Sequence, residues 1–321
     1  MARDLYIGVD IGGTNMRAAL VTGGGEILHA GKMDTLIHQG ARPAVERLAE
    51  LCRSLMAIAA QRGDRVKGIG LGVPGKIDAA AGRVLFSPNL PALNDFELVP
   101  EVEKCLELPV RMENDAHVFG LGENWVGASS GIANWIGYTL GTGVGGCLIL
   151  NNRLWTGDGL GFVAEIGHTI VVPGGARCGC GLHGCLEAYS SATALMNGVR
   201  EALGDGRLTG GPLFEGARNS SLGAEAVFRA ASEGDAVARG LVERLGWALG
   251  VSIANTFTLL GIRHAVIGGG ISAGWDQFEK PMRDALAGHC SMLDPGEMAV
   301  RRAQLGDDAA LLGAARLMME E

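Results

Sequence analysis

Apolar residues along the chain follow two spacings, one typical of buried strands and one typical of helices. Residues 43–62 show the helical spacing clearly, because their apolar positions recur every three or four residues. Shorter apolar runs that end at glycine or proline indicate strands. We expect strands at about 5–11, 16–22, 26–33, 66–73, 76–78, 83–87, 109–112, 134–140, 146–150, 264–267 and 298–301. We expect helices at about 43–62, 97–107, 115–126, 192–203, 222–232, 235–260, 275–288 and 308–319. Strands that alternate with helices in this way predict an α/β protein.

An internal repeat divides the chain. Residues 7–21 (IGVDIGGTNMRAALV) align without gaps on residues 136–150 (IGYTLGTGVGGCLIL). Both copies begin with Ile-Gly, turn at glycine and threonine, and end in an apolar strand. Two such copies predict two domains built on one plan, with a hairpin from each facing a cleft between them. We place the first domain at residues 1–117, completed by a C-terminal helix at about 305–321, and the second at residues 118–304.

The turns of both hairpins have the composition of a phosphate-binding site, because glycines expose backbone N–H donors and threonine adds a hydroxyl. These turns are Gly12-Gly13-Thr14 and Gly141-Thr142-Gly143. Asp10 ends the first strand, where its carboxylate is placed to hold a magnesium ion. A lone glycine turn is usually only a turn, but the repeat favours phosphate binding. Neither turn fits the P-loop pattern, which is excluded, and the dinucleotide-binding pattern is disfavoured. A third run, Gly268-Gly269-Gly270, either admits an adenine ring or only caps a sheet.

Asp115 is a candidate general base. It lies where a predicted strand gives way to a helix, and ligands collect at the C-terminal ends of strands in open α/β sheets. Its carboxylate could take a proton from a hydroxyl nucleophile, with Asn114 orienting that hydroxyl. The alternative is that Asp115 simply caps the helix. Gly75 and Asn89 are similarly ambiguous, since both lie in turns where loop residues are common.

The segment from Glu165 to Glu187 carries a candidate zinc site. Three cysteines and an upstream histidine supply the donors of a closed tetrahedral centre; they are His168, Cys178, Cys180 and Cys185. Two alternatives remain open, buried cysteines that only pack and a disulfide between two of them. His183 could also replace His168 as the ligand. A loop held rigid by a metal, with a carboxylate at each end, suits a polyhydroxylated ligand.

Composition narrows the class of protein. The chain has 321 residues, 47% of them hydrophobic, which is enough for two folded domains. The net charge of −8, without a basic run, disfavours nucleic-acid binding. No stretch of about 18 apolar residues predicts a membrane span, and the N-terminus does not look like a secretory signal. Seven cysteines, four of them scattered, indicate free thiols in a reducing cytoplasm.

Together these motifs resemble the ROK family (repressors, open reading frames, sugar kinases). The resemblance runs in order along the chain, through DIGGTN at 10–15, Glu113-Asn114-Asp115, GTGVGG at 141–146, Glu165-x-Gly167-His168 and the cysteine motif at 178–187. It implies a two-domain actin-like, ribonuclease-H-like fold with ATP and the active site in the interdomain cleft, and usually a homodimer. The repressor branch carries an N-terminal DNA-binding module. That module is not expected here, because the first hairpin starts at about residue 5.

The resemblance also implies roles for individual residues. Asp115 would be the general base of a magnesium- and ATP-dependent hexose kinase acting on a primary hydroxyl, with glucose the first candidate. Other sugars, other phosphoryl donors and a non-catalytic sugar sensor stay open. The sugar ligands would be Gly75, Asn89, Asn114, Glu165, His168 and Glu187. The structural zinc would be held by His168, Cys178, Cys180 and Cys185. The nucleotide and its phosphates would meet Asp10, Gly12, Gly13, Thr14, Asn15, Gly141, Thr142, Gly143, Gly268 and Gly269.

Overall fold

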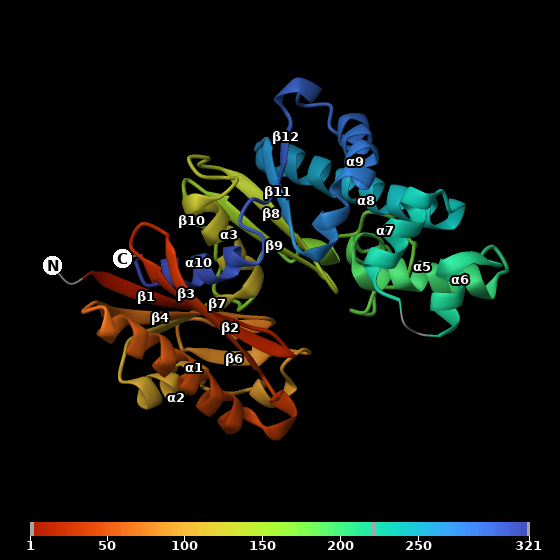
Figure 1. The fold of residues 1–321 in the computed structure, drawn as a ribbon. Helices are drawn as coiled ribbons and strands as arrows, with labels where there is room; N and C mark the ends of the chain where they lie inside the picture. Colours follow the sequence, from red (N-terminus) through yellow and green to blue (C-terminus); the bar gives the residue numbers. More distant parts are fainter. Residues whose placement is uncertain (1–2, 220–221, 320–321) are drawn as a thin grey trace. The chain divides into compact units, whose positions relative to one another are not determined.

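The computed structural model describes residues 3–219 and 222–319 and divides the chain into two compact units. The first unit comprises residues up to 133, residues 147–163 and the residues from 303 onward. The second unit comprises residues 134–146 and 164–302. The chain forms two five-stranded sheets, and both units contain helices (Figure 1).

The first unit is built on a five-stranded sheet of order β3-β2-β1-β4-β7. Its strands are β1 (Asp4–Ile11), β2 (Asn15–Thr22), β3 (Ile27–Asp34), β4 (Arg65–Val73) and β7 (Val110–Asn114). The first three pair antiparallel, whereas β1, β4 and β7 pair parallel. A small hairpin of β5 (Lys76–Asp78) and β6 (Arg83–Phe86) follows β4.

Helices cover both faces of this sheet. Helices α1 (Ala41–Gln61) and α2 (Leu98–Leu106) lie on one side, and α10 (Asp308–Leu317) lies on the other beside α3 (Asp115–Val126) (Figure 1). The alternation along β1 explains this arrangement. Leu5, Ile7 and Val9 are fully buried in the core on the α1 side. Gly8 faces the other way, because alternate residues of a strand point to opposite faces.

Small residues let α10 approach its neighbours at backbone distance. A Cβ at Gly8 would lie 1.8 Å from the Leu311 carbonyl oxygen, and one at Gly122 in α3 would lie 2.1 Å from that of Ala309. Only glycine fits at such sites, since any side chain would overlap the backbone of the partner helix. The C-terminal helix is therefore an integral layer of the first unit.

The second sheet repeats the order of the first, as β10-β9-β8-β11-β12. Its strands are β8 (Trp135–Leu140), β9 (Val144–Leu150), β10 (Arg153–Leu154), β11 (His264–Gly268) and β12 (Ala299–Arg302). Strands β8, β11 and β12 pair parallel, and β9 pairs antiparallel with β10. The two copies of the internal repeat thus become β1–β2 and β8–β9, the central pair of each sheet.

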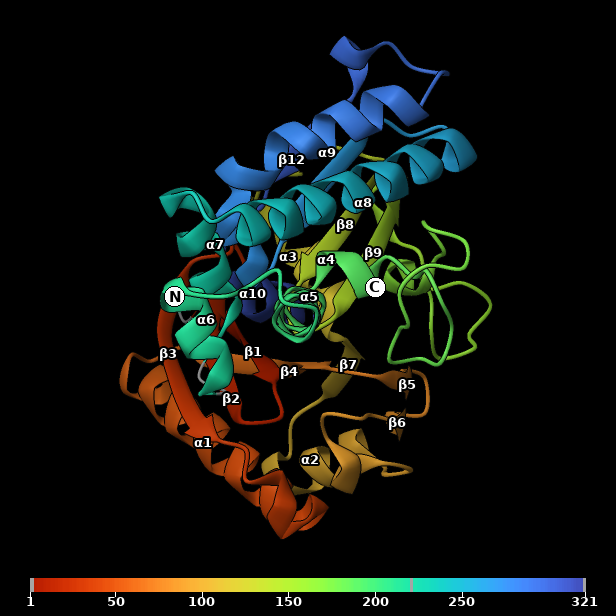
Figure 2. The same ribbon diagram turned by 90° about the vertical axis from the view of Figure 1, so that its right-hand side faces the viewer.

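The second unit carries most of the helices. Helices α8 (Ala236–Leu260) and α9 (Trp275–His289) pack side by side (Figure 2). Gly250 in α8 makes this contact close, because a Cβ there would lie 2.2 Å from the Met282 carbonyl oxygen. The remaining helices are α4 (Glu187–Ser190), α5 (Ala192–Gly204), α6 (Gly211–Arg218) and α7 (Ala224–Glu233).

The predicted strands and long helices are confirmed within a few residues of their ends. Helices α4 and α6 and strand β10 were not predicted. Helix α6 has glycine and proline at its start, which break the helical pattern in the sequence although proline fits the first turn of a helix. The C-terminal helix ends at Leu317, and residues 320 and 321 of its expected range lie outside the described residues.

The compact units differ from the expected domain boundaries at two places. Residues 118–133 and 147–163, assigned above to the second domain, group with the first unit. Helix α3 belongs there because it packs on α10. The division into functional domains stays a prediction. Over residues 3–219 and 222–319, no helix combines the length and apolar character needed to cross a bilayer.

Substitution of two helical glycines by alanine should change the free energy of unfolding in opposite directions. Gly122→Ala should lower the free energy of unfolding by about 1–3 kcal/mol, because the new methyl overlaps the Ala309 carbonyl. Gly240→Ala in α8 should raise it by up to about 1 kcal/mol, because nothing lies within 4 Å and alanine is the better helix former. Urea denaturation followed by circular dichroism measures both. Equal responses at the two positions would contradict the close packing of α3 on α10.

Candidate functional site

The candidate residues of the first unit lie at one edge of its sheet. In register, Asp10 of β1 pairs with Gly72 of β4, which pairs with Glu113 of β7. Because these strands are parallel, their C-terminal ends meet at the same edge. The glycine turn after β1, Gly75 after β4, Asn114 at the end of β7 and Asp115 directly after it are therefore brought together there. This is the edge where open α/β sheets bind ligands.

The first glycine turn is tightly closed. The Gly12 N–H donates to the Asn15 carbonyl oxygen at 2.9 Å, and the Thr35 hydroxyl donates to the Gly12 carbonyl oxygen at 2.7 Å. A Cβ at Gly13 would lie 2.9 Å from the Asn89 carbonyl oxygen. The structure thus places Asn89 beside the turn. The two residues are 76 positions apart in the sequence, and no local pattern predicts their contact. Gly13 and Thr14 are exposed, as a turn that receives phosphate requires.

Asp10 has a partner that the sequence analysis missed. Arg17 Nη2 donates to Asp10 Oδ2 at 2.7 Å, and Arg17 Nη1 lies 3.3 Å from Asp307 Oδ2. Arg17 is directly opposite Asp10 in the β1–β2 register, so the pairing follows from strand geometry. The Asp10 carboxylate is thereby oriented at the strand end. A magnesium ion bound there would share it with Arg17.

Asn114 and Asp115 have distinct positions at the start of α3. Asn114 is the N-cap, and its Oδ1 accepts the Ala116 N–H at 2.9 Å. Its Nδ2 donates to the Gly75 carbonyl oxygen at 3.1 Å, which joins two predicted site residues. Asp115 is the first residue of the helix, and its Oδ1 also accepts the Ala116 N–H at 2.9 Å. The capping role proposed as an alternative for Asp115 thus belongs to Asn114.

A buried ion pair lies next to these residues. His117 Nδ1 is 2.9 Å from Glu113 Oε1, and both side chains are almost fully buried. Glu113 Oε1 also accepts the Asn114 N–H at 2.8 Å. Burial alone would lower the pKa of His117, but the hydrogen bond and charge of Glu113 outweigh it, and the pKa is raised above its ordinary value. The sequence alone indicates no role for His117, since a lone histidine in an apolar helix carries no pattern.

The second unit gathers its glycine turns at the corresponding edge. Strands β8 and β11 are parallel, with Thr139 in register with Gly268. Gly269 has a φ of 83°, and a Cβ there would lie 2.4 Å from the Leu140 carbonyl oxygen. The turn Gly141-Thr142-Gly143 comes directly after Leu140. The structure therefore brings these two predicted nucleotide segments together.

Helix α5 begins against the second turn. The Ala192 N–H donates to the Gly141 carbonyl oxygen at 2.9 Å, and the Thr193 hydroxyl donates to the Thr142 carbonyl oxygen at 2.7 Å. The Gly141 N–H donates to the Gly143 carbonyl oxygen at 2.9 Å. In this turn the acceptor is two residues after the donor, whereas in the first turn the acceptor Asn15 is three residues after the donor Gly12. The two hairpins thus share a plan but differ in their turns.

The four predicted metal ligands form one cluster. One donor atom each from His168, Cys178, Cys180 and Cys185 lies within 4.8 Å of the others. The sulfurs of Cys180 and Cys185 are 3.7 Å apart, as are Cys178 Sγ and His168 Nδ1. Zinc–sulfur bonds of about 2.3 Å in a tetrahedron separate sulfurs by about 3.8 Å. A disulfide needs about 2.0 Å. The donor set fits a zinc ion and not a disulfide.

The surroundings of the cluster agree with this fit. Burial is the main cause that raises the pKa of the Cys178 thiol to about 12, and a metal ion bound there would supply the positive charge that favours its thiolate. His183, the alternative ligand, places its Nδ1 3.1 Å from the Gly175 carbonyl oxygen. The geometry favours His168 as the fourth donor.

The two glutamates at the ends of the cysteine segment differ in their surroundings. Glu187 opens α4, and its Oε2 accepts the Val144 N–H at 3.0 Å. A Cβ at Gly143 would lie 2.3 Å from the same oxygen. Glu187 thus contacts both the second hairpin and the cysteine cluster, since Cys178 Sγ lies 3.5 Å from its Oε1. Glu165 is exposed and precedes the 3-10 turn that ends at His168.

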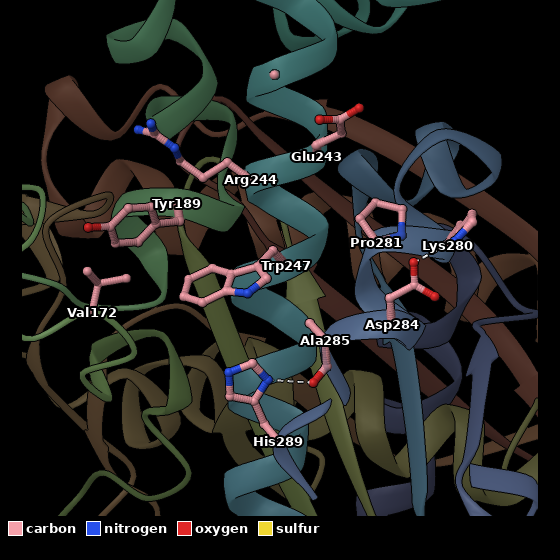
Figure 3. A pocket seen from close by; sticks show the side chains of 11 residues that line it. Val172, Tyr189, Glu243, Arg244, Trp247, Lys280, Pro281, Asp284, Ala285 and His289 are labelled. Carbon is pink, nitrogen blue, oxygen red and sulfur yellow. Dashed lines mark hydrogen bonds and ion pairs between the residues drawn. The ribbon is translucent and has the colours of Figure 1, made fainter. Parts of the chain in front are cut away.

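A separate cavity of about 980 Å³ lies between α8 and α9 (Figure 3). The indole of Trp247 faces it, with His289 edge-on at 6.0 Å between ring centroids, and Lys280 pairs with Asp284 on its rim. Among the described residues, none of the predicted site residues lines this cavity. Although the cavity is large, we therefore do not assign it as the binding site of the sugar or the nucleotide.

The duplicated sheets, with glycine turns at the edge of the parallel strands in each, define the two-domain actin-like, ribonuclease-H-like class of ATPase fold. Within this class the chain belongs to the ROK family, whose model matches residues 6–321. A glucokinase from Thermotoga maritima is 36% identical, over 98% of this chain and 97% of the relative.

Solved structures agree with this assignment. A ROK hexokinase from Thermus thermophilus superposes with a TM-score of 0.80 at 31% identity, over 97% of this chain and 96% of that one. A ROK family glucokinase from Streptomyces griseus, in complex with glucose and AMPPNP, gives 0.77 at 34% identity over 98% of both chains. Other names also occur among the relatives. An N-acetyl-D-glucosamine kinase from Shigella flexneri is 29% identical over 99% of this chain and its own full length.

The cysteine cluster predicts one bound zinc ion per chain. Cys180→Ser should lower the affinity for zinc by more than about tenfold, since even the loss of a residue that only supports a ligand costs that much. Metal analysis after dialysis against a chelator measures the content, and competition with a chromophoric chelator measures the affinity. Cys105→Ser, on α2 and outside the cluster, is the control. If the Cys180 variant kept stoichiometric zinc, the cluster would not be the site.

Proposed function

We propose that this ROK-family sugar kinase transfers the γ-phosphoryl group of ATP to the primary hydroxyl of a hexose, with glucose as the acceptor. The observation that carries the proposal is the register at one edge of the first sheet. Asp10 of β1 and Glu113 of β7 lie in one row across β4, and Asn114 and Asp115 directly follow Glu113. A hydroxyl nucleophile needs a base, and a phosphoryl donor needs a phosphate-binding turn. Both kinds of group occur at this one edge.

The residues of the first unit divide the chemistry between them. Asp115 accepts the proton of the attacking hydroxyl, and Asn114, fixed by Gly75, orients that hydroxyl. The turn at Gly12–Asn15 offers backbone N–H groups to the donor's phosphates. A magnesium ion, when bound, spreads the charge of the transferring phosphoryl group, and Asp10 is the residue that would hold it. No lysine is required at the turn.

The residues of the second unit serve the same reaction. The turn at Gly141–Gly143 and the run at Gly268-Gly269 bind the nucleotide through their backbone. Glu165, His168 and Glu187 bind sugar hydroxyls as acceptors and donors. Zinc on His168 and the three cysteines would fix the histidine ring, so that its other nitrogen presents a defined hydrogen-bonding group. Glu187 also links the sugar segment to the second hairpin through Val144.

Glucose is preferred as the acceptor because the similar structures and relatives at 31–36% identity carry the names hexokinase or glucokinase. N-Acetylglucosamine is the alternative to test first, in view of the kinase from Shigella flexneri. Other hexoses present similar hydroxyls, and single contacts decide among them. A homodimer in the cytoplasm, with a role in glycolysis, is part of the same proposal.

Asp115→Asn should bind sugar normally but lose turnover by a factor on the order of 10²–10⁴, because the amide cannot accept the proton of the hydroxyl. Steady-state kinetics with coupled ADP release measures turnover, and calorimetry measures sugar binding. Asp276→Asn, on the exposed start of α9, is the matched control and should behave as wild type. Turnover near that of the wild type in the Asp115 variant would show that Asp115 is not the general base.

The acceptor and donor are tested by one panel. With ATP, glucose should give the highest kcat/KM among glucose, mannose, fructose, allose, N-acetylglucosamine and N-acetylmannosamine. With glucose, ATP should exceed ADP and polyphosphate as donor. A higher kcat/KM for another sugar would correct the acceptor but keep the reaction. Absence of phosphorylation with every pair would favour a non-catalytic sugar sensor.

A further inference from the structure

The side chain of His117 lies between two groups that only accept hydrogen bonds. Its Nδ1 is 2.9 Å from Glu113 Oε1, and its Nε2 is 3.4 Å from the Val163 carbonyl oxygen. A carbonyl oxygen has no proton to donate. Glu113 Oε1 already accepts the Asn114 N–H, and the oxygens of a carboxylate only accept hydrogen bonds. Both ring nitrogens therefore have to carry protons, and the ring that satisfies the geometry is the imidazolium.

We propose that His117 is held as a buried imidazolium and is a positioning residue for Asp115, because it fixes the start of α3 between β7 and the segment that ends at Val163. The inference rests on the proposed function, in which Asp115 is the base. His117 touches no substrate in this scheme. It acts through Glu113, whose second hydrogen bond holds the backbone of Asn114.

The segment at Val163 makes this position important. It is fixed at two points, by His117 at the Val163 carbonyl and by the Ile77 N–H, which donates to the Gly161 carbonyl oxygen at 3.1 Å. Ala164 follows with a φ of 52°, an uncommon conformation for a residue with a Cβ. Glu165, a proposed sugar ligand, comes next. One ring thus supports the helix that carries the base and the segment that leads to a sugar ligand.

Loss of the ring proton would break this arrangement. A neutral imidazole has only one N–H, so either Glu113 or Val163 would face a lone pair. The charged groups that act on the ring are Glu113 from β7 and Asp115 from α3, and both favour its protonated form. The segment at Val163 contributes a carbonyl dipole. Turnover should therefore fall as pH rises through the raised pKa of His117, and the ring's contribution to stability should be lost in the same pH range.

Two substitutions separate the two hydrogen bonds. Both variants replace the cation with a neutral amide. In His117→Asn the amide nitrogen takes the place of Nδ1 and keeps the hydrogen bond to Glu113, whereas in His117→Gln it takes the place of Nε2 and leaves Glu113 without that donor. We expect kcat to fall roughly ten- to a hundredfold in His117→Gln, the loss of one charge-assisted hydrogen bond, and less in His117→Asn. The KM for ATP should stay unchanged in both. Neither variant should show the alkaline fall that the wild type derives from the ring.

Two further readouts do not depend on activity. The ¹⁵N resonances of the His117 ring should report both nitrogens as protonated at pH 6.5, the ordinary pKa of histidine, because its pKa is raised above that value. Amide exchange at residues 114–117 should be faster in His117→Gln than in the wild type. His29→Asn, at an exposed position on β3, is the control for the pH profile and for the resonance assignment.

The outcomes distinguish this inference from the proposed function. A neutral ring at pH 6.5, or an alkaline fall that persists unchanged in His117→Asn, overturns the role of His117 even if the protein phosphorylates glucose. If no sugar is phosphorylated, the proposed function fails, and the ring resonances and amide exchange still decide whether His117 fixes the start of α3. Equal losses of kcat in the Asn and Gln variants also overturn the inference, since they would show that keeping the hydrogen bond to Glu113 makes no difference to turnover.

Discussion

The parallel pairing of β1, β4 and β7 is the constraint on which the candidate site depends. It sets Asp10, Gly72 and Glu113 in one row across the sheet, so that the residues after each strand emerge at a common edge. A shift of one residue would turn every side chain to the opposite face and move the turns out of line. Gly8 and Gly70 make the pairing possible, because the backbone of α10 occupies the space that their side chains would fill.

Duplication of this sheet explains how one chain supplies two glycine turns. Both sheets have two antiparallel connections followed by parallel strands, in the same order. The two copies of the sheet differ in the segments that follow their strands, which carry the candidate functional residues. In the first unit the residue after the third parallel strand is Asp115, and in the second unit β12 leads instead to α10, which packs in the first unit. The cysteine segment follows β10, in a position where the first unit has only the helix α1.

The sequence indicated the strands, the long helices and the four clustered metal donors, because each leaves a local pattern. Period and glycine placement identify β1–β2, and close spacing identifies Cys178, Cys180 and Cys185. The contacts that the sequence did not indicate depend on the pairing of strands and segments that are far apart in the chain. Arg17 beside Asp10 requires the β1–β2 register, and Asn89 beside Gly13 requires the loop after β6 to return to the first hairpin. His117 has a partner four residues earlier in the sequence, yet its burial and its second acceptor are set by tertiary packing.

Helix α3 is held at both ends by buried carboxylates, and this has consequences for the base that it carries. Glu113 precedes the helix and binds His117. Glu123, fully buried near its end, accepts the N–H groups of Ala128 at 2.7 Å and Leu305 at 2.9 Å. A buried charge without partners is costly, so these hydrogen bonds are strongly favoured over exposure or rearrangement. Because one bond joins the segment after α3 and the other joins the segment that leads into α10, the helix cannot rotate independently. Asp115 therefore keeps its orientation relative to the first sheet.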